Sequence, residues 1–158
     1  MNPCPCGSRI NYLACCGLYI TQLAIPQTPE ALMRSRYTAY FLANIDYIKK
    51  TMQGKALEDF NEDHAANFAN LVQWIGLNIL NIQKDSTDEN IGFVEFIATY
   101  MDKGIIKKIH EQSEFKRING HWFYIDGKTD KIRQQSPTRN APCPCGSQKK
   151  FKNCHARK

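Results

Sequence analysis

The chain has 158 residues, which is enough for one domain of ordinary size with its own hydrophobic core and small appendages. With 42% hydrophobic residues, 23% charged residues and a formal net charge of +6, the composition is globular and excludes a disordered or fibrous chain. The longest apolar runs are a few residues long, which excludes a membrane-spanning helix, and the start MNPCPCGSRI lacks the apolar core of a secretory signal.

The first predicted element is a cysteine knuckle. Cys4 and Cys6 flank a proline that fixes φ between the two thiols, and Gly7 permits the positive φ that turns the backbone around an ion. After eight intervening residues the chain returns with Cys15 and Cys16 side by side. Four protein ligands would close a tetrahedral zinc site with no open position, so the predicted ion is structural and not catalytic.

Three helices are expected next. Thr28 as N-cap, followed by Pro29, predicts a helix that runs through Asn44. Its inner stripe is expected to be Ala31, Leu32, Ser35, Ala39, Leu42 and Ala43. Asp46 is expected to cap a second short helix that ends at Met52, and Asn61 to open a third helix that ends at Gly76.

The hydrophobic period changes after Gly76. Four runs rich in β-branched and aromatic residues are separated by Asp, Ser, Asn and Gly, and they cover Leu77–Gln83, Gly92–Met101, Ile105–Ile118 and His121–Ile125. Asn119-Gly120 between the last two runs predicts a hairpin, because both residues tolerate the positive φ of a type I′ turn. Helices first and strands second predict an α+β domain, not an alternating α/β one.

The end of the chain is basic. Residues 131–158 hold eight Lys and Arg and no acidic residue, whereas residues 1–130 hold 13 basic and 15 acidic side chains. Such a segment is either attracted to an acidic surface, such as RNA, anionic lipid or an acidic protein, or is simply a solvated tail.

The same segment repeats the first knuckle. With an offset of 139 residues, Pro3–Ser8 matches Pro142–Ser147, and aromatic Tyr12 matches Phe151. The second ligand set is therefore Cys143, Cys145, Cys154 and His155, with His155 in the place of Cys16. Both residue types are zinc ligands, so the odd count of seven cysteines becomes two sets of four ligands.

Tyr12 and Phe151 are expected to pack on their knuckles and exclude solvent. Disulfides are the alternative, but they rarely persist in a reducing compartment.

The run CPCGSQKKFKNCH resembles the SEC-C motif at the carboxyl end of the SecA translocation ATPase. This resemblance implies zinc binding and docking to the chaperone SecB, with contacts to ribosomes and anionic lipid. The expected partner-facing residues are Lys149, Lys150, Phe151, Lys152 and Arg157. No G-x-x-x-x-G-K-[ST] loop is present, so no ATPase chemistry follows.

Almost the whole chain resembles the YchJ-like bacterial family. The resemblance rests on the N-terminal knuckle, MRSRYTAYFLANIDYI, WIGLNIL, GFVEFIATY, HEQSEFKRINGHWFYIDG and the terminal SEC-C motif, in that order. It implies a nuclear transport factor 2-like middle domain, a curved sheet wrapped by helices into a cone. The expected organisation is an N-terminal zinc knuckle over residues 1–20, this domain over 26–130, a basic linker over 131–140 and a C-terminal SEC-C motif over 141–158.

A cone of this kind often encloses a cavity, and the residues expected there are Arg34, Arg36, Tyr37, Glu111 and Tyr124. His110 and Glu111 are adjacent on a predicted strand, so their side chains leave opposite faces and cannot form an acid/base pair. Glu111 is placed to pair with Arg34 or Arg36, and such an ion pair is more often structural than catalytic.

The sequence therefore favours a cytoplasmic scaffold with two structural zinc ions, which docks to a protein such as an acidic chaperone or a ribosomal surface. Its central domain would be a scaffold or a small-ligand cavity, and an enzyme is the less favoured class. Two alternatives remain: a small-molecule enzyme with its site in the central cone, and RNA binding through the basic C-terminal tail.

Overall fold

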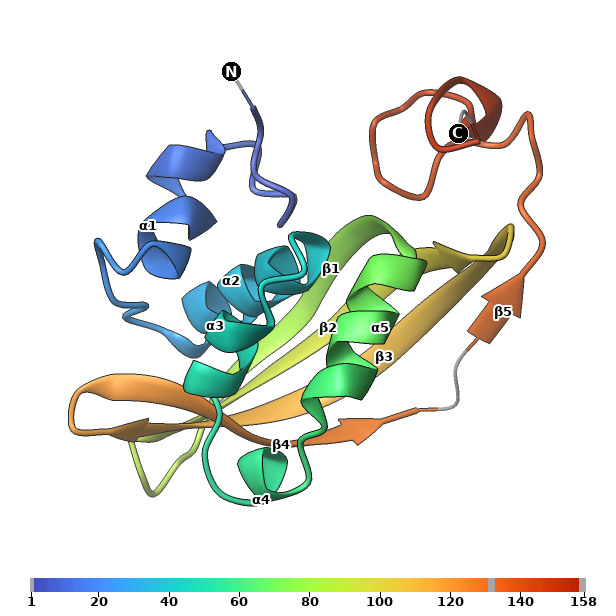
Figure 1. Ribbon diagram of the computed structural model, residues 1–158. Coiled ribbons are helices and arrows are strands. Elements are labelled where there is room, and N and C mark those ends of the chain that lie inside the picture. Colours follow the sequence, from blue (N-terminus) through green and yellow to red (C-terminus); the bar gives the residue numbers. More distant parts are fainter. Residues whose placement is uncertain (1, 131–132, 157–158) are drawn as a thin grey trace.

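A computed structural model describes residues 2–130 and 133–156, in which helices cover one face of a curved antiparallel sheet (Figure 1). None of the helices in these residues has the length and apolar character that a membrane crossing needs. The helices are α1 (Cys16–Ile20), α2 (Pro29–Phe41), α3 (Ile45–Lys50), α4 (Lys55–Glu58) and α5 (Glu62–Leu71), with 3-10 turns η1 (Tyr12–Ala14) and η2 (Phe151–Asn153).

The sheet follows the helices in the chain, as the α+β prediction requires. Its strands are β1 (Gln73–Lys84), β2 (Ile91–Asp102), β3 (Ile105–Ile118), β4 (His121–Thr129) and β5 (Arg133–Gln135), paired in the order β1-β2-β3-β4. β5 pairs with residues 106–108 of β3, beyond the part of β3 that β4 covers. Residues 133–135, within the stretch 131–140 that was expected to be a linker, therefore contribute a strand to the sheet.

Helix α2 forms the centre of the core. Thr28 caps it as predicted, since its Oγ1 accepts a hydrogen bond from the Ala31 amide at 3.1 Å. The helix stops at Phe41, earlier than expected, because Ala43 has a left-handed φ of 53° and leaves the helical path. Leu42, expected inside, is 46% exposed. The buried face is wider than the predicted stripe and also includes Met33, Arg36, Tyr37 and Thr38.

Two further helix boundaries differ from the prediction. Asn44, not Asp46, caps α3, because its Oδ1 accepts from the Tyr47 amide at 3.0 Å. Helix α5 ends at Leu71, and the expectation that it reaches Gly76 is wrong. Residues from Gln73 onward pair with β2, which satisfies their backbone groups and buries Trp74 against helix aromatics.

The Asn119-Gly120 hairpin is confirmed. The two residues have φ of 50° and 81°, and they join β3 to β4 with Ile118 opposite His121.

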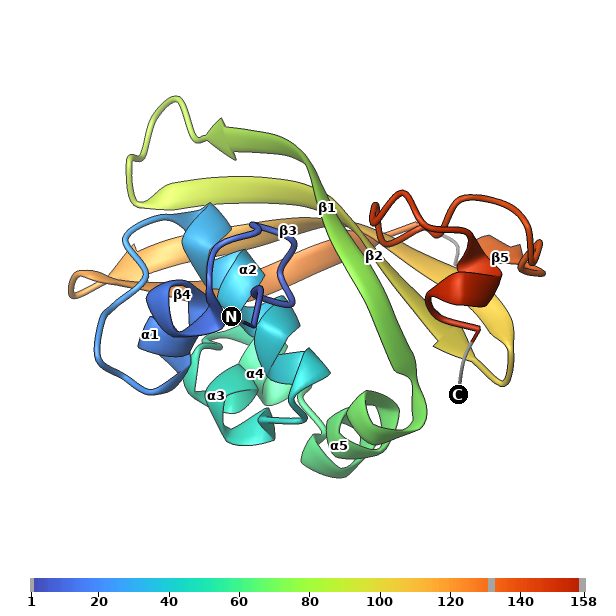
Figure 2. The same cartoon turned by 90° about the horizontal axis from the view of Figure 1, so that it is seen from above.

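The two cysteine knuckles, distant in sequence, lie on either side of β1 (Figure 2). A Cβ added to Gly7 of the first knuckle would lie 3.5 Å from the Leu77 carbonyl oxygen. A Cβ added to Gly76 would lie 3.5 Å from Cys145 Cα of the second knuckle. Gly76 directly follows a bulge in β1, so the knuckles approach the sheet beside an irregular part of this strand.

Candidate metal centres

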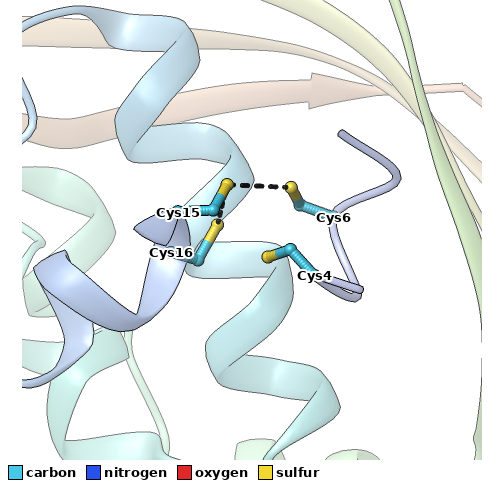
Figure 3. A group of neighbouring side chains, drawn as sticks. All are labelled: Cys4, Cys6, Cys15 and Cys16. Atoms are coloured by element: carbon cyan, nitrogen blue, oxygen red, sulfur yellow. Dashed lines mark hydrogen bonds between the residues drawn. The ribbon is translucent and has the colours of Figure 1, made fainter. Parts of the chain in front are cut away.

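The N-terminal cysteines converge on one point. Figure 3 shows Cys4 and Cys6 on the N-terminal loop facing Cys15 and Cys16 at the start of α1. The four Sγ atoms lie within 4.8 Å of one another, with Cys6–Cys15 at 3.8 Å and Cys15–Cys16 at 4.0 Å. Four thiolates at about 2.3 Å from one zinc ion are separated by about 3.8 Å. The donor set therefore fits a tetrahedral metal ion.

The C-terminal set has the same compactness with one nitrogen ligand. Cys145 and Cys154 Sγ are 3.6 Å apart, and His155 Nδ1 lies 3.1 Å from Cys143 Sγ and 3.2 Å from Cys154 Sγ. All seven cysteines are free thiols, at separations far beyond the roughly 2.05 Å of a disulfide. Burial raises the pKa of the Cys143 thiol to about 12, so a metal ion that binds there displaces a proton.

The two knuckles share one backbone design. In each, a glycine with positive φ follows the second cysteine, and a serine hydroxyl lies near the sulfur of the third. The amide of the first cysteine donates to a carbonyl six residues later, from Cys4 to Ile10 and from Cys143 to Lys149, both at 2.8 Å. The glycine amide donates back to the carbonyl of the first cysteine, from Gly7 to Cys4 and from Gly146 to Cys143, both at 3.2 Å. An isolated β-bridge joins Pro3 to Asn11 in one knuckle and Pro142 to Lys150 in the other. Every pair is related by the same offset of 139 residues that the sequence repeat shows.

The surroundings of the two sites differ. Cys4, Cys6 and Cys16 are 4%, 0% and 1% exposed and belong to the main core beside α2. Arg34 joins the first knuckle to α2, because its Nη1 donates to the Cys6 carbonyl at 3.0 Å.

At the second site only Cys143 is buried, and its other three ligands are half-buried. The second site packs against a small separate hydrophobic cluster formed by Ile75, Ile106 and Phe151. The first site is therefore embedded in the domain, and the second is attached to its surface.

The expected partner-facing residues divide into two groups. Lys149 and Lys150 are exposed and Lys152 is half-buried. Phe151 is 4% exposed and packs under its knuckle, as its predicted packing role requires, so little of its side chain is offered to a partner. Arg157 lies outside the described residues.

Four of the five expected cavity residues line one cavity of about 230 Å³ between the helices and the sheet: Arg36, Tyr37, Glu111 and Tyr124. Arg34 does not, since its Nε pairs with Glu30 at 2.8 Å and its Nη1 faces the first knuckle. From the spacing of residues along α2 alone, it was not possible to tell whether Arg34 faces the knuckle or the cavity.

The proposed ion pair between Glu111 and an arginine does not form among the described residues. Glu111 Oε1 instead accepts from Ser113 Oγ at 2.7 Å and from Tyr124 OH at 2.9 Å. His110 leaves the opposite face, as the strand geometry predicts, where its ring nitrogens lie 2.7 Å from carboxylate oxygens of Glu95 and Asp130. The role of Asp130 in that group was missed, because the predicted last strand stopped at Ile125 and the hairpin pairing was not extended to His110.

Comparison with known proteins gives the family. The sequence profile described as YchJ, middle NTF2-like domain matches residues 28–127, and the profile of the SEC-C motif matches residues 139–157. The chain belongs to the YchJ-like family. A UPF0225 protein of Photorhabdus laumondii is 44% identical over 156 residues, with 96% of each chain covered. A UPF0225 protein of Serratia proteamaculans is 39% identical over 163 residues, with 98% of this chain and 97% of the relative covered.

Solved structures of two SEC-C motif-containing proteins resemble the YchJ-like chain. The solution structure of the Rhodopseudomonas palustris protein has a TM-score of 0.73 and 34% identity, over 82% of this chain and 99% of that one. The crystal structure of the Psychrobacter arcticus protein has a TM-score of 0.71 and 28% identity, over 99% of this chain and 96% of that one. The Psychrobacter arcticus structure therefore shares the fold over nearly the whole of this chain.

Proposed function

We propose that this YchJ-like protein is a zinc-stabilised interaction protein, in which the N-terminal knuckle holds the core together and the C-terminal SEC-C knuckle docks to an acidic protein surface. One observation carries the proposal: the same knuckle occurs twice, once embedded in the core and once on the surface with a basic exterior. The central domain is the scaffold that presents the second knuckle.

The outward-facing residues of the two knuckles support different roles. Ile10 and Leu13 of the first knuckle are 52% and 70% exposed. With the offset of 139, Lys149 and Lys152 take their places in the second knuckle, and Lys150 takes that of Asn11. Because equivalent backbone hydrogen bonds hold both knuckles, the change from Ile10 and Leu13 to lysines mainly alters the surface offered to a partner.

Zinc is the metal that these donor sets favour. Sets of four thiolates, or of three thiolates and one imidazole, are those of structural zinc sites, which leave no ligand position for water or substrate. The free state of all seven thiols fits a reducing cytoplasm, where disulfides rarely form. We further propose that the N-terminal knuckle is a second SEC-C motif, since it shares ligand order and hydrogen bonds with the matched one.

An acidic protein is favoured over RNA as the partner. Single-stranded RNA is usually held by aromatic side chains that stack on its bases. The aromatic residue of the C-terminal knuckle, Phe151, is buried and cannot stack on a base. The knuckle therefore offers charge without a stacking platform, which suits an acidic chaperone such as SecB or an acidic ribosomal protein.

The test measures binding of the intact, zinc-loaded protein to purified SecB by calorimetry and to ribosomes by co-sedimentation, each at low and high salt. The triple variant Lys149→Gln, Lys150→Gln, Lys152→Gln should lose at least tenfold in affinity, and binding should weaken steeply with salt. The matched control removes the same charge elsewhere, with Lys84→Gln, Lys116→Gln and Lys128→Gln, at exposed positions on the sheet. Equal binding by both variants would refute docking through the knuckle, and binding to naked ribosomal RNA alone would favour the RNA alternative.

A further inference from the structure

The cavity in the central domain contains polar groups that the proposed docking role does not use. It lies between α2, α5 and the inner face of the sheet, with a volume of about 230 Å³. Most of its wall is apolar or aromatic, with Phe68, Trp74 and Phe96 opposite Met33 and Met52. Ring contacts hold the aromatic part rigid: Tyr37 and Phe68 each meet Trp74 edge to face, at centroid distances of 5.4 and 5.5 Å.

Trp74 places an indole N–H donor in this wall, and none of the described residues accepts a hydrogen bond from it. The residue is 7% exposed, and its Nε1 is buried without an acceptor among the described residues. The other tryptophan, Trp122, is equally buried, and its Nε1 donates to the Gln27 carbonyl at 3.2 Å. A buried donor without an acceptor costs free energy, so the indole of Trp74 would gain a hydrogen bond from an acceptor that enters the cavity.

Arg36 adds a second, charged donor to the same cavity. It is 5% exposed, and its Nη1 donates to the Ile48 carbonyl at 2.8 Å and to Thr51 Oγ1 at 2.7 Å. The guanidinium lies over the Tyr124 ring, 4.6 Å from its centroid. A guanidinium has five N–H donors, and those on Nε and Nη2 make no hydrogen bond with the described residues.

The one carboxylate of the cavity wall does not neutralise Arg36 by contact. The oxygens of Glu111 accept instead from the hydroxyl groups of Tyr124 and Thr129 on β4 and of Ser113 on β3. These three hydroxyl groups hold the negative charge of Glu111 at the wall. Because Glu111 is already bonded to hydroxyl groups, the Arg36 donors that bond none of the described residues remain available to an anionic ligand in this mostly apolar cavity.

We propose that this cavity binds a small aromatic carboxylate, with the ring against the aromatic wall and the carboxylate oxygens accepting from Arg36 and Trp74. The size agrees, because a cavity of about 150 Å³ holds benzene, and about 230 Å³ holds a ring with a short acidic substituent. The planar carboxylate also matches the fork of the guanidinium. This inference is independent of the knuckles and of their partner.

The protein provides its own readout, because Trp74 and Trp122 are its only tryptophans. A proton–nitrogen correlation spectrum of the intact protein gives two indole signals, which a Trp122→Phe variant assigns. Benzoate and cinnamate, titrated to about 10 mM because ligands of this size bind weakly, should shift the Trp74 signal saturably and leave that of Trp122 in place. Benzamide and benzylamine, of similar shape without the negative charge, should bind at least tenfold more weakly.

Two variants complete the test. Arg36→Gln should abolish saturable binding, and Arg36→Lys, which keeps the charge and better preserves the fold, should weaken it at least fivefold. Arg117→Lys is the matched control, since Arg117 lies over the other tryptophan at 5.6 Å and should not affect binding. An unmoved Trp74 signal with all four compounds would overturn the proposal, as would equal responses to benzoate and benzylamine, or full affinity in the Arg36→Lys variant.

Discussion

Cys16 and His155 occupy the same position in two copies of one knuckle, yet Cys16 is 1% exposed inside the main core and His155 is half-buried at the edge of the molecule. After Cys16 the chain continues into α1, which packs on α2. The same local design therefore serves as part of the core in one place and as an appendage in the other.

The first prediction concerns the residue after each of these ligands. Gly17→Ala would place a Cβ 2.6 Å from the Tyr12 carbonyl oxygen, a backbone atom that cannot move aside freely. We expect the free energy of unfolding to fall by more than about 1 kcal/mol. The equivalent residue in the second knuckle is already alanine, so Ala156→Gly should change the free energy of unfolding by less than about 0.5 kcal/mol. Chemical denaturation of both variants measures the difference, and similar values for the two would contradict the close approach.

A second prediction tests the link between the first knuckle and α2. Arg34→Met removes the hydrogen bond to the Cys6 carbonyl and should cost about 1–2 kcal/mol of unfolding free energy. Glu30→Gln removes only the partly exposed partner of Arg34 and should cost less than about 0.5 kcal/mol. Denaturation curves for the two single variants decide this, and an equal loss in both would assign the effect to the ion pair.

The sequence was most informative where a local rule fixes the structure. The spacing of Cys4, Cys6, Cys15 and Cys16, the Thr28 cap and the Asn119-Gly120 turn each depend on a few neighbouring residues, and the structure agrees with them. The α+β order also follows from the change of hydrophobic period after the helices.

The predictions were wrong where contacts between residues far apart in the chain determine the structure. Trp74 and Ile75 fit a helical stripe as well as a strand, and only pairing with β2 selects the strand. Arg34 and Arg36 are two positions apart on α2, and only the placement of the first knuckle directs Arg34 toward Cys6 and leaves Arg36 to the cavity. No sequence signal shows that Trp74 Nε1 finds no acceptor among the described residues, because that depends on how α2, α5 and β2 pack around it.

A third prediction concerns the attachment of the C-terminal knuckle. Phe151→Ala removes the side chain that packs with Ile75 and Ile106, and should cost about 2–4 kcal/mol of local stability. Amide exchange should accelerate across residues 141–156 and stay unchanged in α2 and β2, because the main core does not include Phe151. Lys150→Ala, an exposed neighbour, is the control and should leave exchange unaffected. Faster exchange throughout the chain after Phe151→Ala would show that the knuckle is part of the main core.

The fourth prediction uses the substitution that the repeat itself contains. His155→Cys gives the second site the ligand set of the first, and the variant should still bind two metal ions per chain. With cobalt in place of zinc, the thiolate-to-metal absorption should rise from the level of seven thiolates to that of eight. Loss of one metal ion in this variant would mean that the second site requires an imidazole and that the two knuckles are not equivalent.

The most direct test of the account is a chelator titration of the intact protein, followed by native mass spectrometry and circular dichroism on the same samples. We predict two zinc ions per chain at the start. The first ion to leave should come from the half-buried C-terminal site with the central domain still folded, and the second, held by the buried cysteines at positions 4, 6 and 16, should leave only as the domain unfolds. A chain that contains no zinc, or one that unfolds on losing the first ion, would contradict the assignment of one structural and one peripheral knuckle.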